Sequence, residues 1–327
     1  LSHHGVRKPS KPEKLQPVFN AAGKFKGKSL NDRFHQGPDL LNKLIAVLLR
    51  FRQHEIAIVG DIKAMYHQVA LPPEDYDCFR FLWLSDDGAL QHTRFTRHLF
   101  GAVFCSASST YALRRTVNEF KDVPEVVKRV VENDMYVDDM LTSQTASDNK
   151  KDAITVITKT PEILNRRKFP LVQMITNDPE LMKLIPEARK AKNVVELTPD
   201  SVSRTLGLRW NILQDEFFFV YDYTPPECVT VRLMLSVNKS TYDPIGYLAC
   251  YILPGKLIFQ EALRRGLTWD DVIPPDLQTR WCEFLNALKS ICNLKVPRCI
   301  KPTLFDDAVI TLHNFSDASL VAYGCMS

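Results

Sequence analysis

An acidic pair, Asp138-Asp139, lies between two apolar segments, Met135–Val137 and Met140–Thr142. Two strands that are separated by two residues have the spacing of a β-hairpin, so both carboxylates are expected at its tip. Adjacent carboxylates on an otherwise apolar hairpin are costly unless water or cations compensate their charge. The pair therefore indicates either a cation site or an ordinary solvated turn.

The Asp-Asp dipeptide occurs four times, so its surroundings decide its meaning. Asp86-Asp87 precedes Gly88, as in a turn, and Asp270-Asp271 precedes a helical stretch, as in a cap or a loop. Asp306-Asp307 is predicted to be a surface turn. Only the pair at 138–139 has apolar strand on both sides.

A third carboxylate, Asp61, ends the apolar strand predicted at 56–60. If this strand neighbours the hairpin, Asp61 and Asp138 converge. Three hard oxygen ligands with few His or Cys residues nearby suit Mg²⁺ and not zinc or copper. Two such ions, about 4 Å apart, activate a 3′-hydroxyl group and stabilise the leaving pyrophosphate. The three carboxylates thus indicate polymerase chemistry.

A rival phosphate site, Ala22–Ser29, fits a loose P-loop pattern, with Ile56–Asp61 as its acidic metal-binding strand. A P-loop must open a helix whose N-terminus faces the phosphates. Asn31-Asp32 and Gly37-Pro38 follow at once and leave no room for a ten-residue helix. A basic exposed loop is therefore the favoured interpretation.

Hydrophobic periodicity predicts a chain that mixes strands and helices. Helices are expected over residues 40–51, 106–120, 123–131, 150–168 and most of 229–300. Strands are expected over residues 17–22, 56–59, 65–71, 79–84, 92–95, 170–176, 205–221 and 308–315, and the other residues before 40 are expected to form loops with short strands.

Composition excludes a disordered chain. The 327 residues are 45% hydrophobic and 24% charged, which suits about two globular domains. The best uncharged run, near 244–255, is far shorter than the roughly 20 apolar residues of a membrane-spanning helix. The eight cysteines contain no C-x-x-C pair, so they are expected to be reduced intracellular thiols and not zinc ligands or disulfides.

The net charge of +4 hides an uneven distribution. Residues 1–55 hold 11 Lys and Arg against 4 Asp and Glu, a surplus of seven positive charges. A local basic surface of this kind suits a polyanionic partner such as nucleic acid.

A series of short motifs follows one another along the chain. Tyr136–Asp139 alone is a weak signal, but the ordered series is a strong one. The motifs span residues 29–32, 37–41, 48–52, 61–69, 79–83, 100–102, 111–114, 136–139, 206–211, 242–246 and 269–271. In this order they resemble the reverse transcriptase region of the BEL/Pao class of LTR retrotransposon polyproteins, together with the connection and the first strand of ribonuclease H.

The resemblance implies an α+β, right-hand polymerase fold with fingers, a palm built on an antiparallel sheet, a thumb and a connection region. Residues 1–222 would form the fingers and palm with a primer grip, 223–265 the thumb, 266–305 the connection and 306–327 the truncated start of a ribonuclease H-like domain. That last segment offers one carboxylate, Asp317, so no RNA cleavage is expected. Both ends of the chain are expected to be cut from a longer polyprotein.

The resemblance also implies roles for single residues. The metal ligands and catalytic residues would be Asp61, Asp138 and Asp139, which would hold two Mg²⁺ ions, with Mn²⁺ as a substitute. The incoming nucleotide would be contacted by Tyr66, Phe100, Gly101, Tyr136, Lys24 and Lys26. Among these, Tyr66 would exclude a 2′-hydroxyl group by its bulk, and a plain core aromatic is the alternative interpretation.

The implied activity is that of an RNA-directed DNA polymerase, a nucleotidyltransferase. Its partners would be an RNA or DNA template-primer, deoxynucleoside triphosphates, and the neighbouring ribonuclease H, integrase and capsid parts of the polyprotein, without a membrane. The expected location is intracellular, in the cytoplasm within the element's particle, or in the nucleus.

Several departures from the family fall at functional positions. The arginine that clamps the triphosphate in the family is replaced by Gln16, followed by Pro17, and a neutral side chain cannot make a bidentate charged contact. The family's Gly-Gly-Phe and following Lys, after the catalytic hairpin, are replaced by Arg167–Phe169 and Gln173. The alternative function is therefore a decayed or domesticated copy that keeps the fold and nucleic-acid binding but little or no polymerase activity. Lysines 8, 24, 26 and 28 are candidates to replace the lost arginine.

Overall fold

The computed structural model describes residues 1–8, 11–191, 202–205, 208–221, 223, 228–240, 242–300 and 311–326. The chain divides into two compact units. Unit 1 comprises Leu1–Phe51 and Ile56–Val195, and unit 2 comprises Arg52–Glu55 and Glu196–Ser327. Four residues near the N-terminus thus belong to the unit that the C-terminal part of the chain builds.

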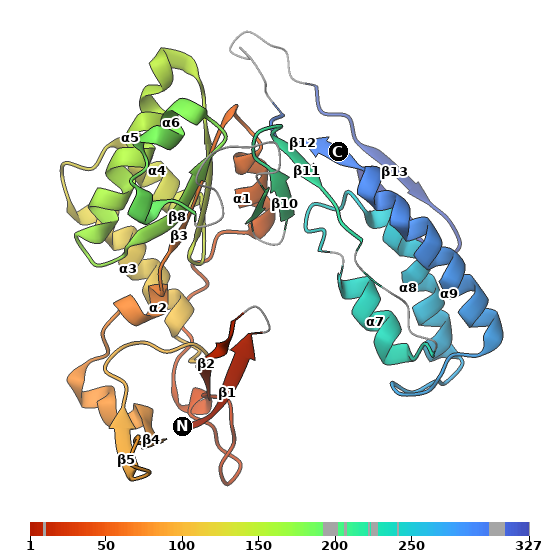
Figure 1. Cartoon of the computed structure of the whole chain (residues 1–327), viewed down its shortest axis with the longest axis horizontal. Helices are drawn as coiled ribbons and strands as arrows, with labels where there is room; N and C mark the ends of the chain where they lie inside the picture. Colours follow the sequence, from red (N-terminus) through yellow and green to blue (C-terminus); the bar gives the residue numbers. More distant parts are fainter. Residues whose placement is uncertain are drawn as a thin grey trace. The chain divides into compact units, whose positions relative to one another are not determined.

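Unit 1 contains a four-stranded antiparallel sheet with the order β6-β7-β3-β8. Figure 1 labels two of its strands, β3 and β8. Its strands are β3 (Ile56–Ile62), β6 (Met135–Tyr136), β7 (Asp139–Gln144) and β8 (Leu171–Thr176). The first five residues of β3 are all buried, which explains why its sequence is continuously apolar and does not alternate. The strand predicted at 56–59 is confirmed and extends through Asp61.

Helices surround this sheet. They are α1 (Leu44–Phe51), α3 (Cys105–Glu119), α4 (Glu125–Asn133), α5 (Ser147–Asn165) and α6 (Pro179–Leu184). Helices α4 and α5 pack on the strands, α3 packs on α4 and α5, and α1 contacts β6 and β7. Helices α3, α4 and α5 confirm the predicted ones to within a few residues, whereas α1 begins at Leu44 and not at residue 40. Helix α6 was not predicted.

The N-terminal residues form more regular structure than predicted. Strands β1 (Ser2–Lys8) and β2 (Lys11–Asn20) make one long antiparallel hairpin, where the sequence predicted loops with short strands and one apolar strand at 17–22. Most of the hairpin's described side chains are exposed, so it lacks the apolar alternation that identifies a half-buried strand. A second hairpin, β4 (Arg80–Leu84) with β5 (Leu90–Arg94), agrees with prediction.

The segment after β3 contradicts the sequence prediction. Residues 65–71 were expected to continue as a strand, but Met65–Gln68 form the short helix α2. Ala64 adopts a left-handed conformation with φ of 51°, and this residue ends the extended path of the chain. The turn lets Met65 enter the core while Tyr66 remains half-buried.

A second core of unit 1 is rich in aromatic side chains and contains the buried His98. The core is built on Phe79, Leu99 and Cys105, and the His98 ring lies 5.0 Å from the Phe104 ring, edge to face. The Nδ1 atom of His98 has no hydrogen-bond partner among the described residues. Burial lowers the pKa of His98 to about 4, since a charged imidazolium loses its hydration there.

Replacing His98 by glutamine is expected to make unit 1 less sensitive to acid. In the folded state His98 binds its proton only near pH 4, whereas in the unfolded chain it does so near pH 6.5, so its contribution to stability is lost as pH falls between these values. The difference amounts to at most about 3 kcal/mol. The melting temperature of His98→Gln minus that of wild type should therefore increase as the pH is lowered from 7 to 4.5. A difference that stays constant over this range would refute the prediction. The same change at exposed His92 is the control.

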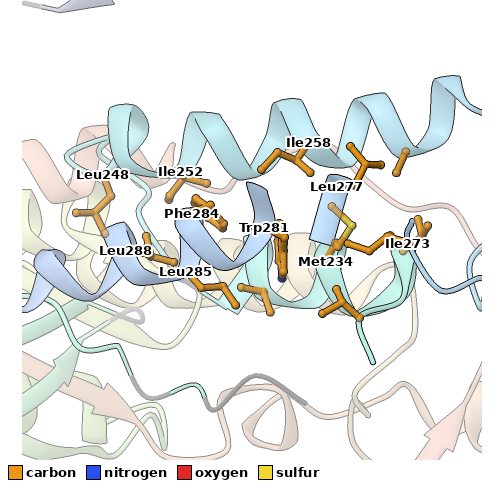
Figure 2. Close-up of a cluster of buried hydrophobic side chains, with 14 of the residues drawn as sticks. Met234, Leu248, Ile252, Ile258, Ile273, Leu277, Trp281, Phe284, Leu285 and Leu288 are labelled. Atoms are coloured by element: carbon orange, nitrogen blue, oxygen red, sulfur yellow. The ribbon is translucent and has the colours of Figure 1, made fainter. Parts of the chain in front are cut away.

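Unit 2 contains a bundle of three helices, α7 (Val231–Ser240), α8 (Ala249–Arg264) and α9 (Pro275–Leu288). Figure 2 shows their shared core, in which Trp281 and Phe284 of α9 lie among aliphatic side chains of the other two helices. Gly255 permits the close approach of α8, because a Cβ atom there would lie 2.4 Å from the Phe284 ring and 2.5 Å from Asn238 Oδ1. The predicted helical content of residues 229–300 is confirmed.

A four-stranded antiparallel sheet completes unit 2, with the order β12-β11-β10-β9. Its strands are β9 (Val202–Thr205), β10 (Leu208–Asn211), β11 (Glu216–Phe218) and β12 (Lys295–Pro297). Residues 212–215 turn between β10 and β11, as the predicted strands around Gln214–Glu216 require. The resemblance places the primer grip at 206–219, and residues 206–207 of it lie outside the described residues.

Arg298 is fully buried beside this turn and joins three segments of unit 2. Its guanidinium group pairs with both carboxylate oxygens of Asp215, at 2.6 and 2.7 Å. It also donates to the backbone carbonyl groups of His54 and Glu55, at 2.9 and 2.8 Å. Trp210 donates to the same Asp215 carboxylate at 2.9 Å. One buried arginine therefore anchors residues 52–55 in unit 2.

The C-terminal residues form a small hairpin, β13 (Phe315–Ala318) with β14 (Tyr323–Met326). Asp317 lies on β13, opposite Gly324. Of the strand predicted at 308–315, residues 311–314 are not in a strand, and β13 begins at Phe315. Residues 301–310, with the Asp306-Asp307 pair, lie outside the described residues.

None of the helices in the described part of the chain is long and apolar enough to cross a lipid bilayer.

Candidate active site

Asp61 lies where buried strand β3 reaches the open end of the sheet. The strand passes through Gly60, whose missing side chain leaves room for Leu171 of β8: a Cβ atom at Gly60 would lie 3.1 Å from the leucine. After five buried residues, Asp61 is the first half-buried one. A carboxylate is thus held on a rigid strand at the point where solvent begins.

The sequence predicted that Asp138 and Asp139 share the hairpin tip, and this prediction is wrong. Tyr136 pairs with Asp139, so the two-residue turn consists of Val137 and Asp138, and Asp139 is the first residue of β7. Val137 has a φ of 55°, which is a strained conformation for a β-branched residue. The turns that favour two-residue hairpins require a positive φ at this first turn position. The shift by one residue puts the two carboxylates in different backbone environments.

The sheet brings the three carboxylates together. Asp139 lies directly opposite Asp61 in the β3–β7 register. The backbone N–H of Ile62 donates to the carbonyl oxygen of Asp138 at 2.8 Å, which ties the turn to β3. The sequence predicted that Asp61 converges with the acidic pair if β3 neighbours the hairpin. Strand order meets this condition, because β3 pairs with β7.

The carboxylates destabilise one another's charged forms. Burial raises the pKa of Asp139 to about 7, and the charges of Asp138 and Asp61 add to the rise. The pKa of Asp61 is raised by burial and by Asp138. Within the described ranges, none of the three accepts a hydrogen bond or an ion pair from a side chain. The site therefore has a deficit of positive charge, which a bound cation would relieve.

Hard carboxylate oxygens on a rigid sheet suit Mg²⁺ or Mn²⁺. No three His, Cys, Asp or Glu side chains are already grouped as a metal site in the residues described. The donor chemistry and the mutual repulsion of Asp61, Asp138 and Asp139 fit a divalent cation, which would draw them closer.

Tyr66 is half-buried, and its pKa responds to the charge of Asp138 in this acidic group. Its ring packs on Phe100 with 4.8 Å between centroids. Burial raises the pKa of the Tyr66 hydroxyl group, a hydrogen bond with Ser106 opposes the rise, and the charge of Asp138 adds to it. The phenol therefore lies close enough to Asp138 to sense its charge, while Phe100 is about half exposed.

The loop around Gly101 is held by a residue to which sequence reasoning assigned no role. Gly101 has a φ of 99°, which favours glycine, and its carbonyl group accepts a hydrogen bond from the Asn31 side chain at 2.9 Å. The Asn31 Oδ1 atom accepts from the Val103 backbone N–H at 3.2 Å. Asn31 belongs to one of the family motifs, and that membership was the only signal for it in the sequence.

The remaining predicted nucleotide contacts lie in different settings. Tyr136 is half-buried at the end of β6, directly opposite Asp139. Lys24 and Lys26 lie in an exposed loop after β2, where Lys26 has its ammonium group 5.6 Å from the Phe25 ring. This loop leads into a single 3₁₀ turn at Asn31–Arg33 and not into an α-helix, so the P-loop alternative is wrong.

A buried ion pair supports the acidic hairpin from within unit 1. Asp134, just before β6, accepts from Arg50 Nε of α1 and from the Thr142 hydroxyl group of β7, each at 2.7 Å. Burial raises the pKa of Asp134, and these two hydrogen bonds partly offset the rise. The partners are 84 and 8 residues away in sequence, so local patterns could not identify this support.

Comparison with protein families matches residues 230–327 to a model described as a Pao retrotransposon-like RNaseH-like domain. The match covers less than a third of the chain and runs through α7, α8, α9 and the β13–β14 hairpin. It thus spans the segments expected to form the thumb, the connection and the start of ribonuclease H. None of the curated proteins compared matches the chain.

The fold is similar to that of foamy viral protease-reverse transcriptases. One structure, in complex with an RNA/DNA hybrid, is 14% identical with a TM-score of 0.56 over 90% of this chain and 33% of that one. A second, of a form named dRH with double-stranded DNA, is 14% identical, with a TM-score of 0.55 over 87% and 43% of the two chains. A third, with double-stranded DNA, is 13% identical, with a TM-score of 0.53 over 99% and 60%.

At this identity the likeness establishes a mixed α/β fold of the same kind and nothing finer. The chain spans between a third and three fifths of these structures. With the family match, the findings support a retroelement pol region.

Proposed function

We propose that this chain is the reverse transcriptase segment of a BEL/Pao-type Pol protein and that it extends a primer on an RNA template. The observation that carries the proposal is the register of β3 against β7, which pairs Asp61 with Asp139 and fixes Asp138 in the adjoining turn. Nucleic-acid complexes of the structural neighbours, which contain double-stranded DNA or an RNA/DNA hybrid, agree with a template-primer partner.

Two divalent cations, when bound, would activate the primer 3′-hydroxyl group and neutralise charge on the leaving pyrophosphate. Asp61 and Asp138 would hold them, and Asp139 would support the site from β7. Tyr66 would lie under the incoming sugar, with Phe100 and the Gly101 loop beside the base. The chain's part in the chemistry is thus to fix three oxygen ligands and a steric wall on one rigid sheet end.

In the proposed division of labour, residues 1–222 supply the fingers and palm with the primer grip, which includes the β10–β11 hairpin, and the helical bundle of unit 2 supplies the thumb and connection. The two compact units divide the chain at another place, since this hairpin belongs to unit 2. Deoxynucleoside triphosphates are the proposed substrates, and the neighbouring polyprotein parts are proposed partners. The surplus of positive charge in residues 1–55 would face the template backbone.

Primer extension tests the proposal. The chain is incubated with an RNA template, a DNA primer, deoxynucleotides and Mg²⁺, beside the Asp138→Ala/Asp139→Ala variant. Extension by wild type that is absent from the double variant is expected. Equal products from both proteins, or no product from wild type, would overturn the proposal and favour the decayed copy. Binding of the template-primer without extension would then identify such a copy.

A ribonuclease H activity is the second candidate, because the family match carries that description. In the described part of the match, β13 offers Asp317 at an exposed position. An RNA/DNA hybrid with labelled RNA, incubated in parallel, separates the two activities. Cleavage that is lost in Asp317→Asn but kept in Asp138→Asn would assign the nuclease to this chain.

Tyr66→Val is expected to weaken discrimination against ribonucleotides. The smaller side chain removes the bulk that would exclude a 2′-hydroxyl group, a contact worth about 10- to 200-fold in kcat/KM. Single-nucleotide insertion with dNTP and rNTP measures the ratio. Tyr66→Phe is the matched control, since it keeps the ring on Phe100 and loses only the hydroxyl group that bonds Ser106. Unchanged selectivity in Tyr66→Val would make Tyr66 a packing residue.

A further inference from the structure

Lys63 lies at the same end of the sheet as Asp61. Side chains alternate between the two faces along an extended chain. Ile62 is completely buried, so Asp61 and Lys63 flank it on the opposite, open side. Lys63 is exposed and follows Asp61 by two residues in the direction of Tyr66.

The backbone of Lys63 is fixed on both sides. Its N–H group donates to the carbonyl oxygen of Pro170 at 3.0 Å, and its own carbonyl group accepts from Gln68 Nε2 at 3.1 Å. The carbonyl group of Gln68 in turn accepts from Arg97 Nη1 at 2.9 Å. The Lys63 side chain therefore projects from an anchored turn and moves only through its own rotamers.

The charge of Lys63 has no partner within the described residues. Its ammonium group forms no ion pair or hydrogen bond there. Three other cations near the N-terminus are engaged. Lys24 contributes to the lowered pKa of Asp32, Lys26 lies over Phe25, and Arg50 is paired with Asp134. An exposed, unpaired cation two residues after Asp61 is available to a ligand.

We infer that Lys63 binds the β- and γ-phosphates of the incoming deoxynucleoside triphosphate, in place of the arginine absent at Gln16. The inference rests on the proposed function. With the α-phosphate at the carboxylates, the inference places the β- and γ-phosphates toward the turn that follows β3. Lysine binds phosphate as a point charge on a flexible stem, so it needs none of the bidentate geometry that an arginine would use.

Lys63→Met tests this inference by nucleotide affinity. Loss of one charge-assisted phosphate contact is expected to raise the KM for dNTP about 10- to 100-fold, with little change in kcat. Lys63→Arg should restore most of the affinity. Lys183→Met, an exposed lysine of α6, is the matched control and should behave as wild type. Melting temperatures of all variants should be equal, since Lys63 supports no packing.

Two binding measurements separate failure of the inference from failure of the proposed function. A fluorescent dNTP with Mg²⁺ is titrated into the complex of protein with a chain-terminated primer-template, which requires no chemistry. Weaker nucleotide binding in Lys63→Met, with unchanged primer-template affinity, supports the inference even if extension is slow. Unchanged nucleotide affinity in Lys63→Met would overturn the inference and leave the polymerase proposal intact. The same conclusion would follow if Lys63→Met weakened the binding of the primer-template and not that of the nucleotide. Absence of nucleotide binding by wild type would overturn both.

Discussion

Asp138→Asn is expected to reduce primer extension at least 1,000-fold and, without metal, to stabilise unit 1. Cations bound by the carboxylates supply several kcal/mol of transition-state stabilisation, and about 4 kcal/mol corresponds to roughly 1,000-fold in rate. The opposite effect on stability arises because the charge of Asp138 raises the pKa of Asp61, Asp139 and Tyr66. Asparagine keeps the shape of the turn residue and removes that charge.

The gain in stability should be about 1 kcal/mol, as is common when a strained functional site is relaxed. For a unit of this size it corresponds to a rise of about 2–4 °C in melting temperature in EDTA. The gain should be largest at pH 8 and shrink toward pH 5. The folded pKa of Asp139, about 7, lies above its unfolded value of 3.8, so wild type takes up a proton there and relieves the same repulsion.

Mg²⁺ supplies a readout of the site that is independent of activity. The cation should raise the melting temperature of wild type and have little effect on Asp138→Asn, because it binds the folded carboxylates preferentially. Asp86→Asn is the matched control, since it removes a charge from another Asp-Asp pair, in an exposed hairpin turn. Equal Mg²⁺ shifts in wild type and Asp138→Asn would contradict a metal site on these residues.

Arg298→Met is expected to give the largest loss of stability in unit 2, about 3–5 kcal/mol. The change leaves the buried side of Asp215 without its cation and removes the donor from the carbonyl groups of His54 and Glu55. Removing one partner of a buried, hydrogen-bonded ion pair has a cost of this size, because the other charge remains buried. Urea unfolding, followed by the fluorescence of Trp210 and Trp281, measures the loss.

The control for this prediction is Arg232→Met, which breaks an exposed ion pair with Asp270 in the same unit. Exposed pairs contribute about 0–1 kcal/mol. Asp215→Asn, which keeps an acceptor for Trp210, should recover part of the loss when combined with Arg298→Met, since it neutralises the unpaired carboxylate. A loss in Arg298→Met no larger than in Arg232→Met would show that the buried network contributes nothing to stability.

The sequence predicted those features that depend on local pattern. Helices with a clear apolar face, the strand predicted at 56–59, and the β4–β5 hairpin around Gly88 agree with the structure. It failed where conformation depends on distant contacts. The β1–β2 hairpin has few buried side chains to impose a period, and α2 depends on a left-handed Ala64 that no residue preference predicts.

The candidate site shows the same division. The sequence supplied the identities of Asp61, Asp138 and Asp139, but only the strand register could place Asp139 opposite Asp61 and move the turn to Val137-Asp138. The clamp on the Gly101 loop and the support by Asp134 involve residues 70 and 84 positions from their partners. Such pairings follow from topology and cannot be deduced from the spacing of residues along one chain.

The anchoring of residues 52–55 by Arg298 has a consequence for how this chain can be made and exchanged. The carbonyl groups of His54 and Glu55 are synthesised about 240 residues before Arg298, which donates to them. Unit 2 therefore cannot reach its final packing until nearly the whole chain has been synthesised. A fragment that begins at residue 196, or a chimera joined there to a related element, would carry the arginine without its two carbonyl partners. Because unit 2 combines residues 52–55 with residues 196–327, no single cut in the gene can separate the two units.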